Sequence, residues 1–269
     1  MKTPSLFDAA RECLDAAIPD EKIARTHAAA DVFARGDLTI ASDAPPPEPI
    51  RMPGRPSRPA LVPARQLPQR GFGSNEGRAA FIHSIAHIEF NAIDLAWDAV
   101  YRFRDLPPEY YADWISVADD EARHFVMLRE RLQQLGYDYG DFDAHNGLWE
   151  MAEQTAHDGL ARMALVPRVL EARGLDVTPG MIVKLRKLGD NATADILEVI
   201  LREEVAHVAA GSRWFRWYCT QRGLDSDTTF ATLLTEYARG SLRGPFNDEA
   251  RLAAGFSAVE LEQLQALLP

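Results

Sequence analysis

The sequence predicts an all-α protein built on a four-helix bundle, with further helices at both ends and an extended arm. Apolar residues recur at steps of three and four along four long segments, and no stretch alternates with the period of two that is typical of strands. About 46% of the 269 residues are hydrophobic, which is enough for a substantial core. We expect four parts: helical residues 1–40, an arm at 41–74, the bundle at 75–222 and a helical extension at 223–269.

The arm is recognised by its composition. Residues 41–70 hold nine of the 17 prolines, five arginines and only two acids, Asp43 and Glu48. Proline interrupts helices and central strands, so this segment should be extended. Its positive charge suggests that it wraps over an acidic body, and a solvated flexible linker is the alternative. Before it, 5–17 and 20–35 have helical spacing.

The bundle segments are 76–104, 108–135, 145–173 and 191–220, with a shorter helix at 181–188 between the last two. We expect Pro167 to kink the third segment and Gly174 to end it. The last helix of the extension should begin at Ser257, because Glu260 three residues later completes a capping box.

Charge and composition narrow the class of protein. The net charge of −11 disfavours a nucleic-acid partner. Two cysteines without a CxxC spacing indicate neither a disulfide framework nor a thiolate metal site. No signal peptide and no run of 18 apolar residues is present, so we expect a cytoplasmic protein without a membrane span.

Charged residues occupy core positions on three of the predicted helices. Glu121 and His124 interrupt the apolar stripe of the second segment, and Glu204 and His207 interrupt that of the fourth at the same spacing. Glu89 lies in the middle of the stripe of the first. Burying carboxylates costs several kcal/mol each unless a cation compensates, and no lysine or arginine shares these positions. A bound metal pair would supply the compensating charge.

Spacing suggests the remaining ligand. Glu89 precedes Glu121 by 32 residues, and Glu171 precedes Glu204 by 33, so both helical hairpins carry a glutamate followed by Glu-x-x-His. Glu153 is the alternative, although its spacing loses this symmetry. Four carboxylates and two imidazoles suit two iron ions, with Mn/Fe and Mn/Mn pairs as alternatives.

An acid precedes each Glu-x-x-His motif, Asp120 in one and Glu203 in the other. Metal-bound histidines usually donate their second N–H to a carboxylate, so we expect Asp120 to hold His207 and Glu203 to hold His124. Exposed acids that add solubility are the alternative interpretation. His83 and His87 are more typical of ordinary histidines than of ligands.

Several stretches, among them HSIAHIEFNAIDLAWDAVYRF, YADWISVADDEARHF, LVPRVLEARGLDVTP and ILREEVAHVAAGSRWF, resemble the bacterial ferritin-like family known as domain of unknown function 455. The resemblance covers nearly the whole chain. It implies a ferritin-like bundle with a dinuclear metal site and ligand roles for Glu89, Glu121, His124, Glu171, Glu204 and His207. The sequence around Glu171 is more distantly similar to tRNA-hydroxylating diiron monooxygenases.

The leading hypothesis is a non-haem diiron oxidase or monooxygenase that activates O₂ on a small organic substrate and draws on an electron donor. A tRNA-modifying hydroxylase is a narrower variant, which the acidity of the chain disfavours. Iron storage or peroxide detoxification, and a non-enzymatic metal-binding protein, are the alternatives from other classes. We expect a monomer or a small homo-oligomer, since long terminal extensions would obstruct a storage cage.

Overall fold

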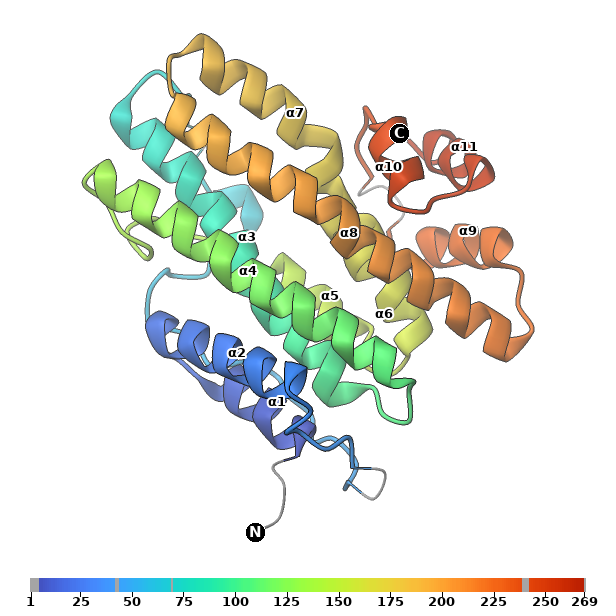
Figure 1. Cartoon of the computed structure of the whole chain (residues 1–269). Coiled ribbons are helices and arrows are strands. Elements are labelled where there is room, and N and C mark those ends of the chain that lie inside the picture. Colours follow the sequence, from blue (N-terminus) through green and yellow to red (C-terminus); the bar gives the residue numbers. More distant parts are fainter. Residues whose placement is uncertain (1–4, 42–43, 69, 239–241, 269) are drawn as a thin grey trace. The chain divides into compact units, whose positions relative to one another are not determined.

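The computed structural model describes residues 5–41, 44–68, 70–238 and 242–268. They fold into helices and contain isolated β-bridges but no strand, so the predicted all-α class is confirmed for this part of the chain (Figure 1). The chain forms two compact units, residues 1–150 and 151–269. None of the helices in the described ranges is long and apolar enough to cross a membrane.

The first unit is built on a pair of long helices, α3 (Asn75–Arg102) and α4 (Pro108–Gln134), which pack side by side (Figure 1). Ser74 caps α3 by accepting a hydrogen bond from the Gly77 N–H, and Pro108 occupies the first turn of α4, where its missing N–H costs nothing. Both boundaries lie within two residues of the predicted ones. The helices α1 (Leu6–Asp15) and α2 (Pro19–Ala34) pack against this pair.

The arm lies over the first unit as an extended segment with one short 3₁₀ turn, η1 (Ala64–Gln66). The Trp149 indole N–H donates to the Arg51 carbonyl, and Leu61 pairs with Ala144 in a β-bridge. Arg55 donates to the Asn91 side chain on α3. These contacts confirm the wrapped arm and argue against a free linker.

The second unit contains α6 (Gly159–Leu165), the π-helix η2 (Val166–Glu171), α7 (Ala172–Lys187) and α8 (Asn191–Arg222). Asp190 caps α8, and Gly223 ends it with φ of 63°, a left-handed conformation that suits glycine. The shorter helices α9 (Ser226–Tyr237), α10 (Asp248–Ala253) and α11 (Ala258–Ala266) complete the unit. Ser257 and Glu260 form the predicted capping box at the start of α11.

The third predicted segment differs from the structure in two ways. Instead of one helix over 145–173, α5 (Gly147–Gln154) ends before α6 begins, because Asp158 caps a new helix by accepting from the Leu160 N–H. The expectation that Gly174 ends the helix is also wrong. The helix α7 continues through Gly174 and Pro179, and its packing against α8 outweighs the weak helix propensity of these residues.

Candidate metal centre

Three of the expected ligands come together in the first unit. Glu89 projects from α3, and Glu121 and His124 lie one turn apart on α4. One ligand atom from each of the three lies within 4.8 Å of the others, and the residues are 4%, 1% and 0% exposed. The packing of α3 along α4 therefore brings into contact residues that are 32 and 35 positions apart in the sequence.

One nitrogen of His124 faces both carboxylates. Its Nδ1 lies 3.1 Å from Glu89 Oε2 and 3.5 Å from Glu121 Oε2. An ion at this position would find carboxylate oxygens and an imidazole nitrogen pointing at it, a donor set that suits iron or manganese.

The electrostatics of this cluster favour a cation. Burial raises the pKa of Glu89, and the negative charge of Glu121 raises it further. Burial disfavours the charged form of His124, but hydrogen bonds and attraction from Glu121 and Glu89 outweigh it and raise its pKa above the usual range. A divalent ion would supply the positive charge that stabilises the two buried carboxylates in their ionised form, so the residues fit a metal.

The second unit repeats the local arrangement. On α8, Glu204 and His207 are 8% and 2% exposed, and His207 Nδ1 lies 3.5 Å from Glu204 Oε1. This is the same kind of atom pair at the same distance as in Glu121 and His124. The equal spacing in the sequence therefore corresponds to equal side-chain geometry on two different helices.

Glu171 is the last residue of the π-helix and is 9% exposed, whereas its rival Glu153 is exposed on α5. Burial thus favours Glu171 over Glu153 as the candidate metal ligand from the third predicted segment. The π-helix contains Pro167, which lacks the N–H that an α-helix would need at this point. The expected kink at Pro167 therefore takes the form of a widened turn, and such turns are frequent at functional sites.

Asp120 and Glu203, the expected partners of the histidines, are both half-buried. Asp120 accepts from Arg123 at 2.6 Å, and Glu203 from Arg202 at 3.4 Å. Each histidine that they were predicted to hold lies in the other unit, so both pairings stay predictions.

His83 and His87 are buried histidines with protein partners, as expected. His83 Nε2 accepts from the Gly140 N–H at 2.9 Å, and His87 Nδ1 lies 2.8 Å from the Tyr139 hydroxyl. Burial lowers the pKa of His83 to about 4 and that of His87 to about 3, so both rings are neutral at pH 7.

Sequence reasoning missed a buried ion pair in the first unit. Lys22 Nζ lies 2.5 Å from Asp94 Oδ1, and both side chains are fully buried. Asp94 follows Asn91 by three and His87 by seven residues, so the three share a face of α3. The signal in the sequence was the recurrence of polar residues, His87, Asn91 and Asp94, at helical spacing within an otherwise apolar helix. This recurrence marks a second buried face of α3, besides the one that carries Glu89.

Comparison with known proteins places the chain in a family. A family model described as "Protein of unknown function (DUF455)" matches residues 15–262. A protein of Haemophilus influenzae (strain Rd), described as "Uncharacterized protein", is 48% identical over 214 residues, which are 77% of this chain and 74% of that protein. No solved structure matches the chain significantly. The match over most of the chain and the high identity both show that the protein belongs to the DUF455 family.

Proposed function

We propose that this protein is a dinuclear-metal oxidase or monooxygenase, with iron as the metal, that acts on a small organic molecule. The observation that carries the proposal is the buried cluster of Glu89, Glu121 and His124. Burying two carboxylates beside each other is costly, and a bound cation offsets that cost. A protein that needed only a stable core would place apolar residues here.

The proposed site has six ligands. Glu89, Glu121 and His124 form one half, and Glu171, Glu204 and His207 form the other. Two observations support treating them as halves of one ferritin-like centre: the glutamate and Glu-x-x-His pattern repeats at spacings of 32 and 33 residues, and the Glu–His geometry on α4 recurs on α8. A glutamate from each of two helices with Glu-x-x-His from two others is the ligand set of diiron carboxylate bundles.

When bound, a ferrous pair in such a site supplies the electrons that reduce O₂. The chain itself contributes the setting. The ligands Glu89, Glu121 and His124 are at most 4% exposed, so the folded chain shields them from water. Low exposure also strengthens each interaction between a ligand and a cation, because little solvent screens it.

Metal analysis of matched variants tests the ligand set. Glu121→Gln and Glu204→Gln should each lose most of the metal that the native protein retains on purification, because each removes a charged donor of the proposed shared centre. Glu130→Gln on α4 and Glu198→Gln on α8 are the controls, since both glutamates are exposed, and they should keep it. If Glu204→Gln kept full metal content while Glu121→Gln lost it, the first unit alone would hold the metal and the shared centre would be wrong.

Oxygen uptake tests the reaction class. Protein loaded with two ferrous ions should consume O₂ faster than Glu121→Gln treated in the same way. If loaded protein neither consumes O₂ nor develops the absorption of an oxo-bridged iron pair, the oxidase proposal fails and a structural metal site takes its place. A hollow multi-subunit cage in a size measurement would instead indicate iron storage.

A further inference from the structure

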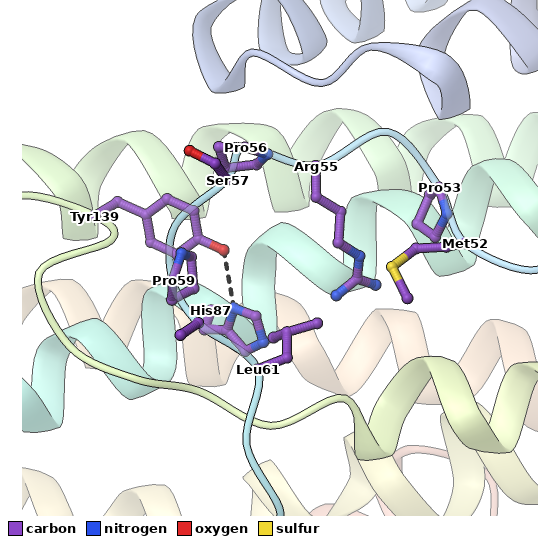
Figure 2. A pocket seen from close by; sticks show the side chains of 10 residues that line it. Met52, Pro53, Arg55, Pro56, Ser57, Pro59, Leu61, His87 and Tyr139 are labelled. Atoms are coloured by element: carbon purple, nitrogen blue, oxygen red, sulfur yellow. Dashed lines mark hydrogen bonds between the residues drawn. The ribbon is translucent and has the colours of Figure 1, made fainter.

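The first unit contains a pocket that is distinct from the carboxylate cluster. It has a volume of about 320 Å³, at the lower end of the range for small-molecule sites, and lies between the arm and α3 (Figure 2). Three prolines, Met52 and Leu61 give it apolar walls, whereas Arg55, Ser57, His87 and Tyr139 contribute polar groups. Met52 and Ser57 are exposed and mark its mouth.

Arg55 is incompletely bonded within this pocket. Its Nη2 donates to Asn91 Oδ1 at 3.0 Å, but its Nε is buried and has no hydrogen-bond partner. A buried N–H without an acceptor costs free energy, and the cost is larger for a charged group. Figure 2 shows the side chain reaching from the arm toward His87 and Leu61, so the guanidinium borders the open space.

The charge around Arg55 is unbalanced. Asp94 is the acid that attracts Arg55, but Lys22 already pairs with that carboxylate at 2.5 Å. Two cations therefore share one anion, and burial lowers the pKa of Arg55 because the guanidinium lacks sufficient compensation. One negative charge on a ligand in the pocket would balance the two positive charges of Arg55 and Lys22 against the one negative charge of Asp94.

His87 and Tyr139 form a fixed polar wall. The His87 Nε2 lies 3.0 Å from the His145 carbonyl and 3.1 Å from Asn91 Nδ2, and its Nδ1 lies 2.8 Å from the Tyr139 hydroxyl (Figure 2). Both ring nitrogens are therefore engaged by protein groups. Arg55 is the positively charged group of the pocket lining, so it is the group that would hold an anion.

We propose that this pocket binds a small organic carboxylate, with its carboxylate on Arg55 and its apolar body against Met52, Leu61 and the prolines of the arm. A planar guanidinium donates to both oxygens of a carboxylate, which makes it a geometric match. A single half-buried arginine with apolar walls suits one charge on an apolar body better than the several charges of a nucleotide.

The pocket does not depend on the proposed metal centre. His87 and Glu89 are two residues apart on α3, which turns their side chains about 200° from each other around the helix axis. The carboxylate site therefore uses the face of α3 toward α4, and the pocket uses the opposite face beneath the arm. Binding in the pocket can be measured whether or not metal is present, so the two proposals can fail separately.

Calorimetric titration of the full-length protein with benzoate and hexanoate tests the proposal, with benzamide as the uncharged counterpart of benzoate and inorganic phosphate as an anion without an apolar body. At least one carboxylate should bind, and benzamide and phosphate should bind about tenfold more weakly or worse. Arg55→Gln should weaken carboxylate binding about tenfold or more. Arg51→Gln, which removes the same charge from an exposed position on the arm, should leave it unchanged.

Three results would overturn the proposal. The first is binding of neither carboxylate at about 10 mM, where even a weak site would be filled. The second is benzamide or phosphate binding as tightly as the carboxylates. The third is carboxylate binding that survives Arg55→Gln. The melting temperature of each variant without ligand shows whether it folds, and Arg55→Lys, which retains the charge, should keep part of the affinity if the arginine acts through its charge.

Discussion

The buried ion pair between Lys22 and Asp94 gives the sharpest test of the structure. Lys22 Nζ donates to Asp94 and to the carbonyls of Cys13 and Leu14, at distances of 2.5, 2.9 and 3.3 Å. The change Lys22→Met keeps an unbranched side chain of similar length. It leaves the buried carboxylate without this donor and takes one of two donors from each of the carbonyls, which still accept from Ala16 and Gly54. Breaking a buried pair in this way costs about 3–5 kcal/mol of unfolding free energy.

The cost should depend on pH in a defined direction. Burial raises the pKa of Asp94 to about 6 and Lys22 opposes the rise, so removing Lys22 should raise it further. An acid whose pKa is higher in the folded protein loses stability as the pH rises toward that folded pKa. The free energy of unfolding of the native protein should stop falling near pH 6, whereas that of the variant should go on falling above pH 6. The difference in unfolding free energy between the two proteins should therefore grow above pH 6, by up to about 1.4 kcal/mol per pH unit.

Urea unfolding followed by circular dichroism, at about pH 6 and about pH 8, measures both effects. Lys187→Met removes an exposed lysine from α7 and should change stability by less than about 0.5 kcal/mol. The double change Lys22→Met with Asp94→Leu should recover most of the loss, because it removes the orphaned charge. The reasoning is refuted if Lys22→Met costs less than about 1 kcal/mol at both pH values, or if the double variant is no more stable than the single one.

Three further predictions concern other parts of the chain. Burial lowers the pKa of His83 to about 4, so between pH 6.5 and pH 4 the unfolded chain binds a proton that the folded chain does not. The free energy of unfolding should therefore fall by up to about 3 kcal/mol as the pH falls through this range. His83→Gln should make the free energy of unfolding less dependent on pH there, as measured by acid unfolding. Gly211→Ala should lower the free energy of unfolding by about 1–3 kcal/mol, because the added Cβ would lie less than 3 Å from Pro167. Gly174→Ala adds a Cβ with no heavy atom within 4 Å and should stabilise α7 by up to about 1 kcal/mol. Thermal unfolding of both variants measures the two effects. Ser257→Ala should cost about 1 kcal/mol by removing the capping box of α11, and an unchanged melting temperature would contradict this.

The long helices and the burial of three of the proposed ligands could be predicted because their signals are local. Apolar stripes placed Glu89 and Glu121 on the inner faces of α3 and α4, and the structure buries both at a mutual contact. The capping residue Ser257 acts within its own helix, so its spacing from Glu260 located that helix start.

The features that escaped prediction depend on contacts distant in the sequence. Propensity argues that Gly174 should end a helix, but packing against α8 carries α7 past it. Lys22 looks like an ordinary charged residue in α2, and its burial depends on an acid 72 positions later. Likewise, Arg55 lines a pocket because the arm crosses α3. The composition of the arm predicted only that its positive charge would be attracted to the acidic body of the protein, and it did not predict where the arm would lie.

The π-helix at Val166–Glu171 sets the rotational phase of α7, the helix that continues from it. Each residue of an α-helix turns the chain by about 100°, and a π-helical turn takes up one residue more than an α-helical turn. Deleting one residue between 166 and 171 would therefore restore an unbroken α-helix and leave the side chains of α7 facing close to their present directions. Leu175 and Leu185 would stay in the core. Deleting one residue from the α-helical stretch between 172 and 174 would instead turn both leucines by about 100°, so a one-residue deletion should be tolerated better in the widened turn than beyond it.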